Sequence, residues 1–160
     1  MGQVTTTFRR CAVARRGGPR GRTLRFRSGN AILDMALVLP LLIALTFGAV
    51  EYGYALYIKH SLQAAAREGA RAAIVSGATA TDVQTAVDSS MLAAGFAQTK
   101  YTRPPTIAPA GWASSAAGTT ITVTVQTTWG TAGIAVLPTY LGGISSSKSL
   151  QGATTMRKEG

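Results

Sequence analysis

An apolar segment near the N-terminus constrains this chain more than any other feature. Residues 29–58 read GNAILDMALVLPLLIALTFGAVEYGYALYI, and the stretch from Met35 to Val50 contains no charged residue. A helix through this segment is longer than the ~20 apolar residues that a bilayer core requires. A helix that is apolar all round must be covered on every side, and a chain of 160 residues has little core with which to cover it. We therefore predict a transmembrane helix over residues 30–58 rather than the core helix of a soluble protein.

Positive charge is concentrated in front of this segment. Eight of the sixteen basic residues lie in the first 29 residues, and no acidic residue precedes Asp34. Basic residues beside a transmembrane segment stay on the cytoplasmic side of the membrane. We therefore expect residues 1–29 to form a basic cytoplasmic leader, residues 30–58 to act as a signal anchor, and residues 59–160 to form an extracytoplasmic domain.

Three other interpretations of this region are less consistent with the sequence. A cleaved secretory signal peptide has an apolar region of about 7–15 residues that ends in an Ala-x-Ala-like site, whereas this run is longer and passes into helix-forming sequence. Paired arginines are typical of twin-arginine export signals, but neither pair adjoins the apolar run. The net charge of +10 suggests nucleic-acid binding, yet helix-breaking glycines interrupt the leader and no aromatic-interleaved basic patch occurs. No nucleic-acid partner is therefore expected.

The helical pattern continues beyond the membrane segment, but with only one apolar face. Apolar and small residues recur there at spacings of three and four, the period of an amphipathic helix. Pro40 is expected to kink this rod without ending it, so that the rod from Ala31 reaches ~68 Å before Ser76 and Gly77 stop it. The small residues allow close packing, and we expect them to seat a sheet. The apolar positions are Ile58, Leu62, Ala65, Ala66, Gly69 and Ala73, and the polar positions opposite them are His60, Gln63, Arg67 and Arg71.

A second helix is expected from Asp82 to Ala94. Thr81 precedes it and Gln84 follows three residues later, which is the spacing of a capping box. The apolar stripe of this helix consists of Val83, Val87 and Met91.

The rest of the chain predicts a small antiparallel sheet. Thr120 to Trp129 alternates between two faces, which is the clearest strand signal in the sequence. Ser149 to Arg157 predicts a final short strand, placed at an edge because polar residues dominate it. The prolines between residues 104 and 109 exclude a central strand there, and residues 130–147 predict a long loop. The predicted fold is therefore α+β, with a long N-terminal transmembrane helix that continues into an amphipathic helix packed against the sheet.

The sequence contains no set of residues typical of a catalytic or metal site. His60 is the only histidine and Cys11 the only cysteine, so neither a metal-ligand cluster nor an internal disulfide is expected. Asp82 and Asp88 are six residues apart on the predicted second helix, which places them on different faces. The serines from 145 to 147 have no paired base. We therefore expect a protein that is not an enzyme and that uses no cofactor or metal.

Two stretches of the chain resemble a known family. The segment SGNAILDMALVLPLLIALTFGAVEYGYAL, followed by SLQAAAREGARAAIVSG, is similar to the TadE/TadG-like family of minor pseudopilins, which belong to tight-adherence (Flp, type IVc) pilus systems. That family has a leader ending in glycine, then four residues, an acid and an aromatic residue, an apolar helix with a Leu-Pro pair, and an Ala-Arg-Glu-Gly-Ala-Arg run. This chain supplies Gly29, Asp34, Pro40 and the run from Ala66 to Arg71. It departs from the pattern in having aspartate where glutamate is usual and methionine where the aromatic residue is usual. The C-terminal ATTMRKE is also similar to the strand that closes such domains, and the resemblance implies a pilin-like fold.

The resemblance implies cleavage between Gly29 and Asn30 by a prepilin-type aspartyl peptidase. A glycine before the scissile bond leaves the backbone free to extend into a protease cleft, although a simple helix boundary also explains this glycine. Asp34 likewise has two explanations. A carboxylate in an apolar helix costs ~2.5–3.5 kcal/mol at the bilayer centre and less near its edge, so Asp34 is either an interfacial residue or an assembly acid that meets the new amine of Asn30. Glu51 is interpreted as marking the far membrane interface.

The expected function is that of a minor pseudopilin, a structural or assembly subunit of a bacterial tight-adherence pilus or a related secretion apparatus. Its expected partners are the prepilin peptidase, other pilin and pseudopilin subunits, the inner-membrane assembly platform and membrane lipid. The expected location is the bacterial inner membrane, with one span, a cytoplasmic N-terminus and a periplasmic or extracellular C-terminal domain. The alternative is an uncleaved signal-anchored membrane protein whose extracytoplasmic domain binds a ligand.

Overall fold

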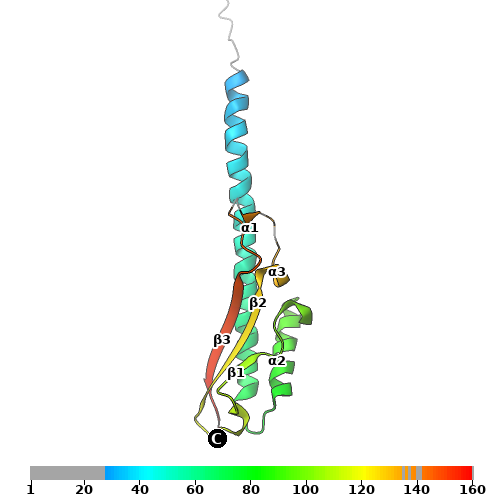
Figure 1. Cartoon of the computed structure of the whole chain (residues 1–160), viewed down its shortest axis with the longest axis vertical. Coiled ribbons are helices and arrows are strands. Elements are labelled where there is room, and N and C mark those ends of the chain that lie inside the picture. The colour runs from blue at the N-terminus through cyan, green and yellow to red at the C-terminus, as the bar shows by residue number, and fades with distance from the viewer. Residues whose placement is uncertain (1–27, 135, 137, 140–141, 160) are drawn as a thin grey trace, which may run out of the picture.

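One long helix organises the whole structure. The computed structural model describes residues 28–134, 136, 138–139 and 142–159, so residues 1–27 of the predicted leader (1–29) lie outside the described residues. Helix α1, Ser28–Ala73, has 46 residues and extends over ~69 Å at 1.5 Å per residue. Figure 1 shows the first half of α1 standing alone and the second half beside the sheet and α2 (Ala80–Ala93). The predicted α+β, pilin-like arrangement is confirmed.

The second half of α1 is the spine of the folded domain. All six apolar positions predicted from the helical spacing are buried. The polar positions opposite them are exposed except for Gln63, which is half-buried. Its amide donates hydrogen bonds to the Ala153 carbonyl at 2.8 Å and to Thr154 Oγ1 at 2.9 Å. The amphipathic pattern is therefore confirmed, and α1 packs against both α2 and the sheet.

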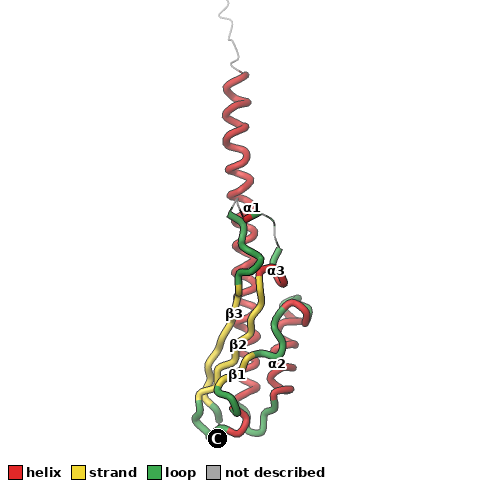
Figure 2. The backbone as a smooth tube through the Cα atoms, in the orientation of Figure 1, coloured by secondary structure: helices red, strands yellow, loops and turns green. Residues whose placement is uncertain are grey.

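Three antiparallel strands cover α1 in the order β1 (Thr106–Ala108), β2 (Thr120–Thr128) and β3 (Ser149–Arg157). Figure 2 shows the strands running along the half of α1 that is remote from the N-terminus. β3 is an edge strand, as predicted, and pairs with β2 along its whole length. β1 forms the other edge, where neighbouring prolines are tolerated. β2 is central, and its inward-facing residues Ile121, Val123, Val125 and Thr127 are buried.

The central strand ends one residue earlier than the sequence predicts. The alternation extends through Trp129, but the chain turns after Thr128 into the short helix α3, Trp129–Ala132. The Trp129 ring is 1% exposed and packs edge-on against Tyr54, with the ring centroids 6.2 Å apart. The side chain is thus buried, as the alternation indicates, while the backbone has already left the strand.

Helix α2 begins earlier than predicted, because its cap is Thr79 rather than Thr81. Thr79 Oγ1 accepts a hydrogen bond from the Asp82 N–H at 3.3 Å, and the Asp82 carboxylate accepts one from the Thr79 N–H at 2.9 Å. The side-chain and backbone hydrogen bonds from Thr79 lower the pKa of Asp82. A carboxylate suits the positive end of the helix dipole better than the amide of Gln84 does. The predicted apolar stripe is confirmed, since Val83, Val87 and Met91 are buried.

A polar cluster around Asp88 ties α2 to the segment that follows it. The carboxylate accepts hydrogen bonds from Gln84 Nε2, the Tyr101 hydroxyl and Arg103 Nη2, each at 2.5 Å. Burial, together with the hydrogen bond to Asp88, raises the pKa of the Tyr101 phenol. The cluster therefore holds the turn region before β1 against α2.

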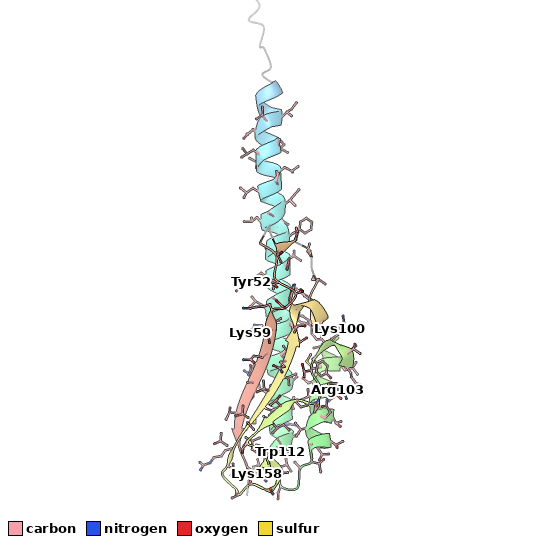
Figure 3. The ribbon with its side chains drawn as sticks, viewed as in Figure 1. Tyr52, Lys59, Lys100, Arg103, Trp112 and Lys158 are labelled. Carbon is pink, nitrogen blue, oxygen red and sulfur yellow. The ribbon has the colours of Figure 1, made fainter. Side chains whose placement is uncertain are left out.

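The C-terminal residues close the end of the domain that is remote from the free half of α1. The Lys158 ammonium donates hydrogen bonds to the carbonyls of Trp112, Ala113 and Ser115 at 3.1, 2.6 and 3.0 Å, and so caps the short helix η2, Trp112–Ser114. Figure 3 shows Lys158 and Trp112 near each other at this end. The Glu159 N–H donates to the Ile74 carbonyl at 3.1 Å. The end of the chain is thus joined to the end of α1.

Two glycines allow the neighbouring elements to approach α1 closely. A Cβ atom on Gly69 would lie 2.7 Å from Val87 Cγ2 and 3.2 Å from Val123 Cγ1, so α2 and β2 both pack at this position. A Cβ atom on Gly152 would overlap the carbonyl carbon of Leu62, so the backbones of β3 and α1 pack directly against each other. A side chain at Gly152 would therefore push the edge strand away from the helix.

Gly152→Ala should lower the free energy of unfolding by about 1–3 kcal/mol, because the added methyl group overlaps the backbone of α1. The matched control is Gly53→Ala on α1, where a Cβ atom meets nothing within 4 Å and alanine favours the helix. The urea midpoint of the full chain in detergent, followed by tryptophan fluorescence, should fall for Gly152→Ala and hold or rise for Gly53→Ala. Equal midpoints for the two variants would contradict this packing.

Candidate membrane anchor and its junction with the domain

The first half of α1 exposes a continuous apolar surface. Every side chain from Ala31 to Val50, here called the anchor, is exposed or half-buried, and Leu37 and Leu45 are 73% and 74% exposed. The anchor is about 30 Å long, the thickness of a bilayer's hydrocarbon core, and α1 is long and apolar enough to cross a membrane once. A contiguous apolar surface of this size marks a membrane or protein contact. The surface is therefore consistent with a single membrane span.

The predicted processing residues lie in the first two turns of α1. Gly29 and Asn30 are in the first turn, where the backbone N–H groups have no acceptor within the helix, so this turn opens at little cost. Asp34 follows Asn30 by four residues and lies on the same side of the helix, one turn later. Its side chain is exposed and makes no hydrogen bond or ion pair with the other residues that the structure describes. Cleavage after Gly29 and an assembly role for Asp34 stay predictions.

Pro40 lies inside the anchor without interrupting it. Helix α1 continues through this residue, as predicted. A proline has no N–H group, so the carbonyl four residues earlier, on Ala36, loses its usual partner in the helix. The kink expected at Pro40 stays a prediction.

Glu51 makes the junction between the anchor and the domain. Its side chain is 2% exposed, and Oε1 accepts a hydrogen bond from the Ile144 N–H at 2.8 Å. The segment between α3 and β3 returns to α1 and supplies this donor, so protein rather than headgroups surrounds the carboxylate. Glu51 therefore has a structural partner in its own chain, while its interpretation as the marker of the far membrane interface stays a prediction. The missed signal is its spacing, because intervals of four, three and four residues extend the buried face of α1 back through Leu62, Ile58, Ala55 and Glu51.

Three tyrosines follow the anchor directly. The Tyr57 hydroxyl donates to the Ala94 carbonyl at 2.7 Å, and the Tyr54 ring contacts the ring of Trp129. Tyr52 is 63% exposed. Tyrosine is enriched at membrane–water interfaces, where its ring suits the apolar side and its hydroxyl the wet side. Their position fits a membrane boundary near the end of the anchor.

The polar residues considered as catalytic or metal-binding candidates lie apart from one another or serve the fold. His60 is exposed on α1, Asp82 caps α2 and Asp88 is the centre of the polar cluster. Ser145 and Ser147 hydroxyls hydrogen-bond each other at 2.9 Å. Within the described part of the chain, no group of three His, Cys, Asp or Glu side chains could hold a metal ion.

Comparison with known proteins identifies the segment that contains the anchor. Residues 29–71 match the family model described as TadE-like protein. The matched range includes Gly29, Asp34 and Pro40 and runs through most of the packed second half of α1. No curated protein and no solved structure matches the chain.

Glu51→Ala should free the segment that contains Ile144, because a partly buried N–H group loses its acceptor, at a cost of about 1 kcal/mol. Trypsin should then cut faster after Lys148, since cleavage requires local opening of the backbone, and mass spectrometry of the released C-terminal fragment measures the rate. The matched control is Glu68→Ala, which removes an exposed acid of the same helix together with its surface ion pair to Arg71. Equal rates for the two variants would show that Glu51 does not hold this segment.

Proposed function

We propose that this chain, which belongs to the TadE-like protein family through residues 29–71, is a minor pseudopilin. Such a protein is a structural subunit of a tight-adherence (Flp, type IVc) pilus or a related secretion apparatus. One observation carries this proposal. A single unbroken helix leaves its apolar first half uncovered and uses its second half as the spine of an α+β domain. Such a helix suits a subunit that is held in a membrane and then packed against the helices of other subunits.

The anchor can be covered either by a membrane or by an assembled filament, for one physical reason. In a membrane, acyl chains cover its side chains, and in an assembled filament the helices of neighbouring subunits cover the same surface. Transfer between the two exchanges one set of apolar contacts for another, so packing rather than a hydrophobic driving force selects the partner. The core of the domain lies on the second half of α1 and stays closed during this exchange. The proposed role is structural and requires no catalytic residue.

The proposed maturation step removes residues 1–29 by a prepilin-type aspartyl peptidase. Two features support it. Gly29 offers no side chain to obstruct the cleft of the enzyme, and the bond to Asn30 lies in the first turn of α1, the part of the helix that unwinds most readily.

The proposed assembly step pairs the new amine of Asn30 with Asp34 of the same or a neighbouring subunit. The exposed carboxylate has no partner among the described residues, and a lone charge in an apolar helix is costly. Ion pairing lowers this cost as helices gather. A pair formed between subunits would also fix their register along the bundle.

In cells that contain the cognate peptidase, the unaltered chain should lose residues 1–29 and Gly29→Leu should keep them, because the leucine side chain obstructs an extended backbone in the cleft. Gly48→Leu is the matched control, since it adds the same side chain farther along the anchor and should leave cleavage unchanged. Intact mass spectrometry measures all three. Met1 still attached to the unaltered chain in assembled material would overturn the processing step and favour an uncleaved signal-anchored binding protein.

The eight leader arginines support an orientation with the N-terminus in the cytoplasm. A reporter that is active only outside the cytoplasm should therefore work when it is fused after Gly160 and fail when it is fused before Gly29. The reverse pattern would refute this orientation while leaving the anchor itself intact.

Asp34→Ala should leave insertion and cleavage intact and reduce co-purification with the other pilin subunits about tenfold, since a charged hydrogen bond is lost. Asp34→Asn should behave like Asp34→Ala because the amide carries no charge, whereas Asp34→Glu should retain most of the recovery. The assay compares recovery from detergent-solubilised membranes, normalised to the amount of cleaved subunit. Full recovery of the alanine and asparagine variants would make Asp34 an interfacial residue and remove its assembly role.

A further inference from the structure

A groove of about 290 Å³ lies beside the junction of the anchor and the domain. One wall belongs to α1 and the other to the segment that leads into β3. Figure 3 shows Tyr52 and Lys59 on α1 next to the end of β3 that faces the anchor. The groove is lined by Tyr52, Leu56 and Lys59 on α1 and by Ile144, Lys148 and Leu150 opposite them.

The helical wall of the groove points a positive charge toward the membrane. Tyr52, Leu56 and Lys59 are spaced by four and three residues and so share one side of α1. Lys59 lies nine residues beyond Val50, about 13.5 Å along the helix axis. Helical side chains lean toward the N-terminus of their helix, which here is the membrane side, and the long lysine stem lets the ammonium group reach back to the interface.

Lys148 lies in the opposite wall, where hydrogen bonds fix its backbone. The Lys148 N–H donates to the Ser145 carbonyl at 2.9 Å, and the Lys148 carbonyl accepts from the Trp129 N–H at 2.8 Å. Its side chain is exposed, as is that of Lys59. Neither ammonium group forms an ion pair with a described residue. The groove therefore combines apolar walls with two lysines that form no ion pair with a described residue.

We propose that this groove binds the headgroup of an anionic phospholipid, with the phosphate between Lys59 and Lys148 and the glycerol and first acyl carbons against Leu56 and Ile144. Charge complementarity and the position directly beyond the anchor carry the proposal. It rests on the proposed function only in requiring that α1 be a membrane anchor, and it depends on neither orientation nor cleavage. A bound lipid would fix the depth of the domain at the membrane surface.

The test uses the full chain in detergent micelles supplied with equal amounts of phosphatidylglycerol and phosphatidylcholine. Native mass spectrometry counts the lipids that remain bound. The unaltered chain should retain phosphatidylglycerol in preference to phosphatidylcholine. Lys59→Gln and Lys148→Gln should each reduce the retained phosphatidylglycerol about fivefold, and the double variant should show no preference. Both side chains are exposed, so the variants should fold.

The matched control is Arg67→Gln, which removes the same charge from an exposed position farther along α1 and should leave lipid retention unchanged. An equal loss in Arg67→Gln would reduce the effect to net charge and overturn the proposal, as would equal retention of the two lipids by the unaltered chain. Lysine variants that keep the lipid in micelles but fail to co-purify with the other pilin subunits from membranes would make the groove a protein interface and overturn the proposal. Release of the unaltered chain from membranes by alkaline extraction would contradict the proposed function itself, whereas an anchored chain without lipid preference contradicts only the groove.

Discussion

The packing of the second half of α1 against α2 and the sheet is the interaction on which the rest of the structure depends. A sheet of three strands, one of them only three residues long, requires a partner to bury its inner face. The helix provides that partner through small residues that permit backbone contact, as Gly69 does toward α2 and β2. Gly152 allows the same close approach from β3, where even a methyl group would meet the helix backbone. Without this close contact the core would open along its whole length.

Because the same helix forms both the anchor and the spine, no flexible linker separates the domain from the anchor. The Glu51 contact with Ile144 strengthens this continuity, since it binds the segment before β3 to α1 at the point where the anchor ends. The domain is therefore held at a definite distance and rotation relative to the anchor. In a filament, the register of the anchor helices would thus determine how neighbouring domains meet. The groove proposed to bind lipid lies beside this same junction.

Asp34 and Glu51 look alike in the sequence but differ in burial, and this difference separates their roles. Asp34 and Glu51 both interrupt apolar sequence on one helix. Asp34 lies on the uncovered part of α1 and has no partner among the described residues, which is the arrangement expected of a group that awaits another subunit. Glu51 is enclosed and hydrogen-bonded within its own chain. The first therefore belongs to the proposed assembly step and the second to the fold.

The sequence by itself determined the features that repeat locally. The spacing of Ile58 to Ala73 predicted the buried face of α1, the alternation in β2 predicted its inward residues, and the polar composition of β3 predicted an edge. The family pattern supplied Gly29 and Asp34 as candidate site residues, whose roles await the experiments above. Only the tertiary structure decided the partner of Glu51 and brought Lys59 and Lys148 to the same groove. It also showed that Thr79, not Thr81, caps α2. Glu51 and Ile144 are 93 positions apart, and periodicity within one segment carries no information about which distant backbone group returns to meet it.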